Sequence, residues 1–269
     1  MNKYLSVPDI SGYKAEYYFS NRVSEENPRN WTPHIHDKLE LYVLIEGDVS
    51  FAVESSNYKL SSGDAIITKP NEIHNCILNS RSVHRHLCFW FDAEAKFIFD
   101  DFLSHEYGSC NHLCPSEEDK EKLLRLYNAL IEANEARDSY TEFYLTLEIL
   151  GTFKRYVNKN REGEPDYPPL MKQILLDIAE NVKSIKSIEY LAAKYYVSQS
   201  TLFRLFKAHL NTTPKHYIEI RRLAYSRKLL KNGLSVKDTA LESGFSNVSN
   251  FIRLFKSRFG TTPRAYKAE

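Results

Sequence analysis

The sequence has no long apolar run, few cysteines and none of the common enzyme loops, and each absence excludes a class of protein. No uninterrupted apolar stretch approaches the roughly 20 residues that a membrane-spanning helix needs. The N-terminal residues MNKYLSVPDISGYK lack the apolar core of a secretory signal peptide, so a cytoplasmic protein without membrane association is expected. Four cysteines are too few for a disulfide scaffold in 269 residues, and reduced thiols are the simplest interpretation.

Motifs of the common enzyme classes are also missing. The chain has no Walker-type phosphate loop, no Gly-rich dinucleotide fingerprint and no G-x-S-x-G nucleophile elbow. Serine and histidine are present, but none stands in a local context that indicates a catalytic triad. The sequence therefore predicts no catalytic residues and favours a protein that is not an enzyme.

Charge is unevenly distributed along the chain. From Pro168 onward there are 18 Lys and Arg residues against 7 Asp and Glu residues, a net charge of +11. The preceding residues carry 18 basic against 28 acidic side chains, a net charge of −10. Opposed halves of this kind indicate separate domains, and the basic one is suited to a polyanion such as double-stranded DNA.

Short aromatic and β-branched runs dominate the first hundred residues. The runs are AEYYFS, ELYVLI, SFAVES, AIITKP and HRHLCFWF. Turn signals separate them at Glu46–Asp48, Ser55–Asn57 and Ser62–Asp64. Many short strands at close spacing predict a β-barrel or jelly roll, which we place at residues 1–115.

A helical pattern begins at Ser116, where Ser-Glu-Glu-Asp combines a cap with carboxylates at the positive end of a helix dipole. Two amphipathic stretches follow, and they predict a helical hairpin at residues 116–158. The hairpin is expected to pack on the barrel, on a second copy of the chain in a homodimer, or on both. The polar segment 158–169 has three prolines and one glycine and is expected to link this part to a domain at 168–269.

The last hundred residues contain an internal repeat. RLFK occurs at Arg204–Lys207 and again at Arg253–Lys256. Thr-Thr-Pro follows each copy, at Thr212–Pro214 and at Thr261–Pro263, and the copies are offset by 48 to 49 residues. A duplicated unit of this size indicates a duplicated supersecondary motif.

Each copy has the residues of a short helix, a tight turn and a longer helix. Ser187 and Ser198 in the first copy, and Ser235 and Ser246 in the second, are expected helix N-caps. Gly244 permits a left-handed turn. This pattern predicts a helix-turn-helix, whose second helix can enter the major groove of DNA.

Residues 213–231, between the two copies, predict one connecting helix. At about 1.5 Å per residue it is roughly 28 Å long. Successive major-groove turns on one face of a duplex lie roughly 34 Å apart, so the two units can address adjacent turns.

Two helix-turn-helix units joined by a long helix resemble the DNA-binding domain of the AraC/XylS family of bacterial transcription regulators. The segment GFSNVSNFIRLFKSRFGTTPRAY carries this resemblance almost throughout, and the likeness extends from about Leu170 to the C-terminus. Two departures are small: Asn211 stands where glycine is usual, and Ser226 stands where alanine is usual.

DNA contacts are expected from residues early on each recognition helix, opposite the apolar face. Arginine can bind guanine bidentately, and asparagine or glutamine can bind adenine. The resemblance favours Arg204 and Arg253 for bases or phosphates, and Lys215 and Arg258 fit phosphates, as do the two RLFK lysines. The predicted DNA-binding residues are Gln199, Ser200, Phe203, Arg204, Lys207, Asn247, Val248, Ser249, Asn250, Arg253 and Lys256.

The β-rich region carries a second resemblance, to the two cupin motifs, in which two His, a Glu and a later His converge inside a small barrel. The matching residues are His34, His36, Glu40, Gly47, Gly63, Pro70 and His74. The spacing from Gly63 to Pro70 is one residue longer than usual, and Glu72 replaces a glycine. The expected fold class is therefore α+β: a cupin-like barrel, a helical hairpin and an all-α C-terminal domain with two helix-turn-helix motifs.

In AraC-like regulators a cupin-like domain commonly binds the effector, and three interpretations of this set stay open. His34, His36, Glu40 and His74 suit a divalent transition metal. The same groups suit hydrogen bonds to an organic effector, with a sugar suggested by the family resemblance alone. They are also compatible with internal hydrogen bonding and no ligand. The predicted effector pocket comprises Trp31, His34, His36, Glu40, Tyr42 and His74.

A ligand-responsive, sequence-specific regulator of carbohydrate-related genes is the function favoured by the sequence. Its expected partners are promoter DNA, a small-molecule effector, a second copy of the chain and, for an activator, RNA polymerase. One alternative is a metal-dependent cupin enzyme with an incidental basic domain, and another is an adaptor that uses its helices for protein contacts. A separate run, His105, Cys110, His112 and Cys114, lacks a paired Cys-x-x-Cys, so plain thiols are expected there.

Overall fold

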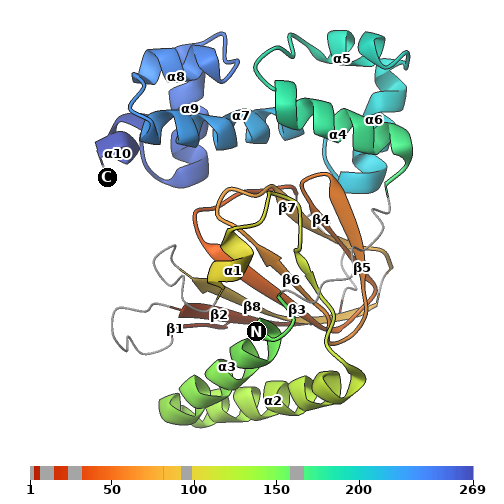
Figure 1. Cartoon of the computed structure of the whole chain (residues 1–269), viewed down its shortest axis with the longest axis vertical. Helices are drawn as coiled ribbons and strands as arrows, with labels where there is room; N and C mark the ends of the chain where they lie inside the picture. The colour runs from red at the N-terminus through yellow and green to blue at the C-terminus, as the bar shows by residue number, and fades with distance from the viewer. Residues whose placement is uncertain are drawn as a thin grey trace. The chain divides into compact units, whose positions relative to one another are not determined.

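The computed structural model describes residues 3–6, 15–23, 32–80, 82–91, 99–157 and 167–268. The chain divides into two compact units (Figure 1). The first takes residues 1–30, 37–72 and 76–166, and the second takes residues 31–36, 73–75 and 167–269. Most of the linker expected at 158–169 lies outside the described residues. Among the described helices, none is both long and apolar enough to cross a membrane.

Nine strands form two sheets in the described part of the chain. Their bounds are β1 Lys3–Ser6, β2 Ala15–Val23, β3 Leu39–Glu46, β4 Val49–Val53, β5 Ser56–Leu60, β6 Ala65–Thr68, β7 His74–Leu78, β8 Val83–Phe91 and β9 His112–Leu113. One sheet has the order β1-β2-β8-β3-β6-β9, and the other has the order β5-β4-β7. The five expected strand runs are all present, but β5 begins at Ser56, inside the turn predicted at Ser55–Asn57.

Strand β3 has both faces buried, and its alternate residues enter two different apolar cores. Leu41 and Val43 belong to a core that also contains Leu130 of the helical hairpin. Tyr42 and Leu44 belong to the other core, with residues of β4 and β5. Because successive side chains of a strand point to opposite faces, the larger sheet separates these cores.

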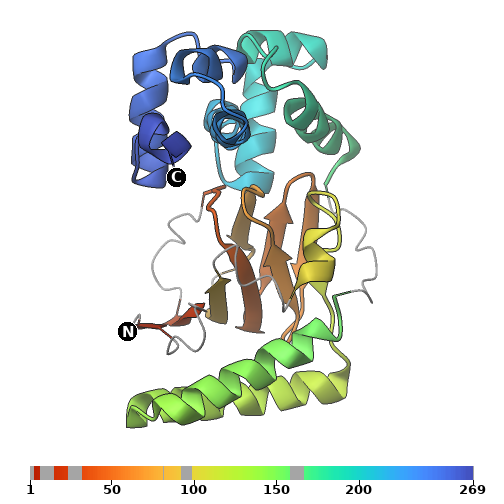
Figure 2. The ribbon, with the colours of Figure 1, turned by 60° about the vertical axis from the view of Figure 1, so that its left-hand side comes forward.

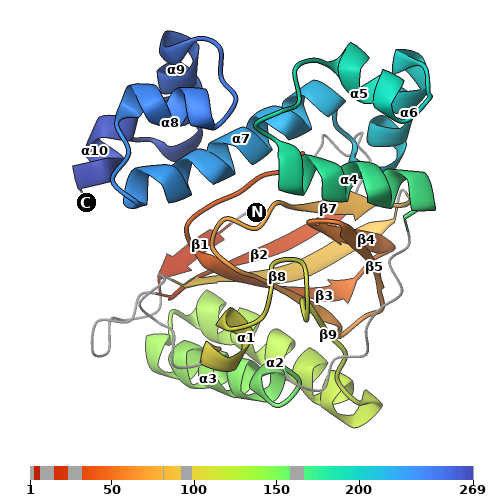
Figure 3. The same cartoon turned by 45° about the horizontal axis from the view of Figure 1, so that its top comes forward.

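The helical hairpin consists of α2 (Glu117–Ala136) and α3 (Ser139–Lys154), and it covers one face of the larger sheet together with α1 (Asp100–Leu103) (Figure 2, Figure 3). Ser116 caps α2 by accepting a hydrogen bond from the Asp119 N–H, and Asp138 caps α3 in the same way. The start of α2 is joined to the end of the hairpin by the Arg155 guanidinium, 2.7 Å from Asp119 Oδ1. The apolar face of the hairpin is therefore used on its own barrel.

Residues 167–268 of the second unit are helical. Its helices are α4 Pro169–Asn181, α5 Ile188–Lys194, α6 Gln199–Leu210, α7 Pro214–Lys231, α8 Val236–Glu242, α9 Val248–Phe259 and α10 Pro263–Ala268. Helices α5 and α6 lie at one end of α7, and α8 and α9 lie at the other (Figure 1). Phe206 of α6 and Phe255 of α9, one in each RLFK motif, are fully buried.

The expected caps are confirmed at Ser187, Ser198 and Ser235, each of which accepts a hydrogen bond from a backbone N–H three residues later. The prediction of Ser246 as a cap is wrong. Asn247 takes that place, because its Oδ1 accepts the Asn250 N–H at 2.8 Å, and α9 begins one residue later than expected. Serine and asparagine are about equally good caps, so two adjacent cap residues cannot be ranked by type alone.

The tight turn differs between the two copies. Gly244 has a φ of +86°, and an added Cβ would lie 2.9 Å from Arg222 Nε and 3.2 Å from the Lys183 carbonyl oxygen. The corresponding residue of the first copy is Tyr196, which adopts a φ of 54° with its side chain 97% exposed. The second turn therefore requires glycine for space as well as for conformation, whereas the first has room for a side chain.

Candidate functional sites

Helices α6 and α9 present the predicted DNA-binding residues to solvent. Buried Leu202, Phe206 and Leu210 hold α6 against its unit, while its opposite face is exposed. The exposed residues are Gln199, Ser200, Phe203, Arg204, Lys207, Asn247, Ser249, Asn250, Arg253 and Lys256, and Val248 is half-buried. Phe203 is 40% exposed, so it does not fill the core.

Two of these side chains, those of Arg253 and Lys207, form hydrogen bonds within or at the end of their own helix. The Arg253 guanidinium donates to Asn250 Oδ1 at 2.8 Å, one turn earlier on α9. Lys207 Nζ donates to Asn211 Oδ1 at 2.6 Å, at the end of α6. Asn247 uses its carbonyl oxygen as the cap of α9, so only its amide N–H groups stay available for a base.

Arg258 is a poorer phosphate ligand than its position in the sequence indicated. Its side chain is half-buried, and burial lowers the pKa of its guanidinium. Lys215 and Lys256 are exposed and stay suitable for phosphate contacts.

Helix α7 holds the two helix-turn-helix motifs through arginines that the sequence did not single out. Arg222 donates to the Ile185 carbonyl oxygen at 2.6 Å, in the loop before α5. Buried Arg227 donates from Nε to the Tyr266 hydroxyl at 3.0 Å and lies 4.8 Å from the Phe259 ring centre. These contacts join both ends of the helical unit to one rod of 18 residues, about 27 Å long.

The cupin-like set predicted from the sequence is brought together. One ligand atom from each of His34, His36, Glu40 and His74 lies within 4.8 Å of the others. The backbones of His34 and His74 form an antiparallel bridge, and their ring centres are 4.3 Å apart. Trp31, the remaining predicted wall of this pocket, lies outside the described residues. The set is therefore a compact polar cluster with the donor atoms of either a metal site or a hydrogen-bonding pocket.

Glu40 and Tyr42 extend this polar cluster along strand β3. Trp90 Nε1 donates to Glu40 Oε2 at 2.7 Å, and the Cys88 thiol lies 3.7 Å from Glu40 Oε1. The Tyr42 hydroxyl is 2.8 Å from His84 Nε2. Burial raises the pKa of Tyr42 well above its usual value, so the hydroxyl keeps its hydrogen and can donate it.

His84 and His86 belong to the same buried face and were missed by the sequence analysis. Their rings stack with centres 4.6 Å apart, and the His86 ring lies 5.1 Å from that of Tyr42. The signal was present in HRHLCFWF, because alternate residues of a strand share a face and β8 pairs with β3. We call the set Glu40, Tyr42, His84, His86 and Trp90 the barrel polar band.

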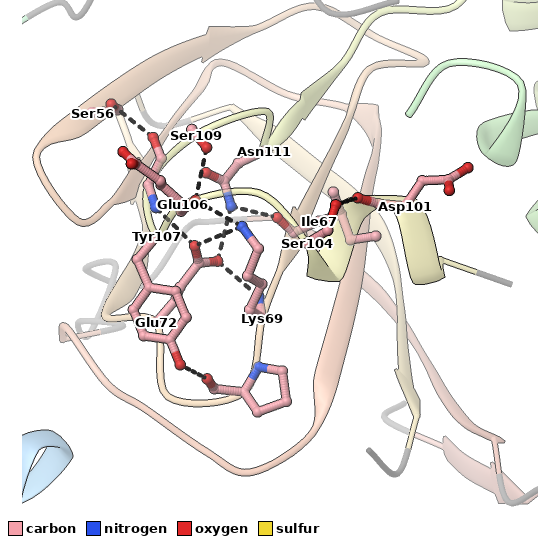
Figure 4. Close-up of polar contacts among 12 residues, drawn as sticks. Ser56, Ile67, Lys69, Glu72, Asp101, Ser104, Glu106, Tyr107, Ser109 and Asn111 are labelled. Atoms are coloured by element: carbon pink, nitrogen blue, oxygen red, sulfur yellow. Dashed lines mark hydrogen bonds and ion pairs between the residues drawn. The ribbon is translucent and has the colours of Figure 1, made fainter. Parts of the chain in front are cut away.

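Glu72, which departs from the cupin pattern, has a structural role (Figure 4). Its carboxylate accepts the backbone N–H groups of Lys69 and Gly108 and the amide of Asn111, at 2.7 to 2.9 Å. Lys69 Nζ lies 3.5 Å from Glu72 Oε1 and donates to the Glu106 carbonyl oxygen at 2.9 Å. Burial raises the pKa of Glu72 to about 7, although the Lys69 ammonium lowers it. The hydrogen bonds to Gly108, Asn111 and Glu106 join the β6–β7 loop to the segment that precedes β9.

Known proteins share both halves of this chain. Residues 22–147 match the family model of the AraC-like ligand binding domain, and residues 191–269 match that of a helix-turn-helix domain. The XylDLEGF operon transcriptional activator 2 of Pseudomonas putida is 32% identical over 130 residues, which cover 47% of this chain and 81% of that protein. The chain belongs to the AraC/XylS family. AraC/XylS proteins are transcription regulators, so the DNA-binding function and the α+β fold expected from the sequence are confirmed.

Similarity to other proteins extends over most of the chain at lower identity. An uncharacterized HTH-type transcriptional regulator of Bacillus subtilis (strain 168), YdeC, is 23% identical over 258 residues, covering 90% of this chain and 88% of that protein. Among solved structures, ToxT from Vibrio cholerae O395 aligns with 95% of this chain and 97% of its own, at 17% identity and a TM-score of 0.38. Other XylDLEGF operon activators of Pseudomonas putida match over 36% of their own length.

Proposed function

We propose that this AraC/XylS protein reads promoter DNA with α6 and α9 placed in two major grooves. The observation that carries the proposal is the duplication: Arg204 and Arg253 occupy matching positions of the two RLFK motifs and are both exposed. Each comes two residues before a fully buried phenylalanine, Phe206 or Phe255. The remaining exposed residues of both helices supply polar groups for bases and phosphates.

Selection of genomic fragments tests this proposal. The full chain should enrich fragments that carry two short conserved half-sites about one turn of the DNA helix apart. Helix α7 separates the two helix-turn-helix motifs by about that distance. Binding should fall steeply with salt, since the helical domain carries an excess of cationic side chains. Enrichment no better than random duplex would contradict the proposal.

The barrel is proposed to bind a small organic effector, and we favour a polyhydroxylated molecule such as a sugar. The barrel polar band brings hydroxyl, imidazole, carboxylate and indole groups together among apolar side chains. Ligand sites commonly have this mixture of an apolar lining and a few polar groups. We assign no catalytic role to these groups, and we propose that the protein acts with DNA in the cytoplasm. The genes it controls are proposed to be carbohydrate-related.

A thermal-shift screen of sugars and sugar acids tests the effector proposal. A ligand at 100 times its Kd stabilises the folded state by about 2.7 kcal/mol. Tyr42→Phe removes a hydroxyl from the band but keeps the ring, so it should weaken the shift. Tyr58→Phe is the matched control, because the Tyr58 hydroxyl donates instead to the Gly108 carbonyl oxygen at 3.5 Å. If the ligand raised the melting temperature of both variants equally, Tyr42 would not belong to the effector site.

The cupin-like quartet supports a second candidate, a metal-dependent cupin enzyme. His34, His36, Glu40 and His74 offer nitrogen and oxygen donors that suit a divalent transition metal. Metal analysis of the purified protein, combined with a DNA shift assay, separates the two functions. Tightly retained metal without specific DNA binding would favour the enzyme, whereas specific DNA binding supports the regulator.

We propose that the protein acts as a homodimer through α3. Tyr140, Tyr144 and Leu147 recur at helical spacing and are 84%, 59% and 43% exposed. Gly151 continues the stripe, and a Cβ there would meet no other atom within 4 Å, so a second helix could approach closely. Tyr144→Glu should yield monomers in sedimentation equilibrium, whereas Tyr190→Glu, on exposed α5, should not. A dimer also presents paired surfaces to RNA polymerase, which would be its partner if it is an activator.

A further inference from the structure

Three chemically different metal-ligating atoms converge where β6, β9 and α2 meet, away from the cupin-like quartet. Asp64 immediately precedes β6, His112 lies in β9, and Cys114 follows β9 just before α2. One ligand atom from each lies within 4.8 Å of the other two. In the sequence, the run that contains His112 and Cys114 lacks a paired Cys-x-x-Cys, so plain thiols were expected there. The missing ligand, Asp64, lies 48 residues earlier.

His112 Nε2 lies next to both of the other candidate ligands. His112 Nε2 is 3.3 Å from Asp64 Oδ2 and 3.3 Å from Cys114 Sγ. Without an ion, Nε2 can donate its hydrogen to Asp64 while the Cys114 thiol donates to Nδ1, 3.5 Å from Sγ. A divalent cation would replace these hydrogens and be bound by all three groups.

We propose that Asp64, His112 and Cys114 bind a divalent transition-metal ion, with zinc as the best-suited metal. Thiolate, imidazole and carboxylate are its three common protein ligands, and the two anionic groups balance its charge. Cys114 is exposed, which leaves the solvent side open for a water molecule as the fourth ligand. This proposal is independent of the proposed effector and DNA functions.

The surroundings of Asp64 orient it for this role. The Ser61 N–H donates to Asp64 Oδ2 at 2.8 Å, and Lys120 Nζ lies 3.2 Å from Asp64 Oδ1. Hydrogen bonds of this kind hold a ligating carboxylate in place. Lys120 belongs to the first turns of α2, and its stem packs over Gly63, where an added Cβ would lie 2.5 Å from Lys120 Cγ. A metal ion here would therefore fasten the start of the hairpin to the edge of the sheet.

Among the described residues, cobalt substitution distinguishes this site from the cupin-like quartet. Co²⁺ bound to a cysteine sulfur gives a sulfur-to-cobalt charge-transfer band, which the quartet of His34, His36, Glu40 and His74 cannot give because it has no sulfur. The full-length protein titrated with Co²⁺ should develop this band to one equivalent, and Zn²⁺ should abolish it. Cys114→Ser should lose the band, whereas Cys110→Ser should keep it.

A second pair of variants guards against misfolding. His112→Gln should also lose the band, and His105→Gln should keep it. Cys114 is exposed, so Cys114→Ser should melt at the parent temperature in the presence of a chelator. A parent protein without the band, or a band that survives in Cys114→Ser, would overturn the proposal. In the first case the cluster would be a hydrogen-bonded Cys-His-Asp group, with Sγ also 3.5 Å from His112 Nδ1.

Discussion

Replacing Arg253 with alanine should separate recognition of DNA from stability of the fold. Arg253 is exposed on α9, and its one described polar contact is the hydrogen bond to exposed Asn250. The substitution therefore leaves no cavity and no buried polar atom, and the free energy of unfolding should change by less than about 0.5 kcal/mol. A lost bidentate contact to a base costs about 1 to 3 kcal/mol of binding free energy.

That binding loss corresponds to a Kd raised about 5- to 150-fold, at about 1.4 kcal/mol per factor of ten. Fluorescence anisotropy on the selected operator would measure it, with single-base variants of the operator tested alongside. Arg253→Ala should lose discrimination at one base position. Arg253→Lys keeps the charge but not the planar fork, so it should lose the same discrimination while keeping more of the affinity.

Lys256→Ala is the matched control on the same helix. A phosphate ligand carries no sequence information, so its loss should weaken binding to all sequences alike and reduce the salt slope by about 1. The reasoning about α9 would be refuted if Arg253→Ala bound the operator as tightly and as selectively as the parent. It would also be refuted if Arg253→Ala behaved like Lys256→Ala, because Arg253 would then contact only the backbone.

Two further predictions concern stability. Because burial raises the pKa of Glu72 from 4.5 to about 7, the folded protein keeps a proton there that the unfolded chain releases. The parent should lose up to about 3 kcal/mol as the pH rises from about 4.5 to about 7, and urea unfolding of Glu72→Gln should lack this dependence while exposed Glu121→Gln retains it. Phe206→Ala should cost about 3 to 5 kcal/mol in urea unfolding, since the ring is fully buried, whereas Phe203→Ala should leave stability nearly unchanged and weaken DNA binding. Equal losses for the two phenylalanines would contradict the assigned faces of α6.

Local patterns predicted much of this fold because their physical causes are local. A serine N-cap depends only on a backbone N–H three residues later, and Ser187, Ser198 and Ser235 were therefore found from type and position. Ser246 was not a cap, because the adjacent Asn247 caps α9. The repeat identified α6 and α9 because both copies carry the same buried and exposed positions. Short β5 was not found, because its Ser-Asn start is typical of a turn.

Residues that act across strands were harder to find. His84 and His86 become part of the barrel polar band only through the register of β8 on β3, which pairs Leu44 with His86. Asp64 meets His112 through the pairing of β6 with β9, a strand of two residues. Neither register follows from one strand considered by itself, so the sequence placed His34, His36 and Glu40, which are close in the chain, and missed these partners.

Strand β3 also connects the inside of the barrel with the hairpin. Glu40 and Tyr42 face one way, and Leu41 and Val43, on the same stretch of backbone, press against the hairpin side. Because these four residues share one stretch of backbone, a displacement of the β3 backbone at Tyr42 would also move the side chains that pack against the hairpin. Ligand binding in the barrel could thus change the position of α3 through the β3 backbone alone, without any loop having to open or close.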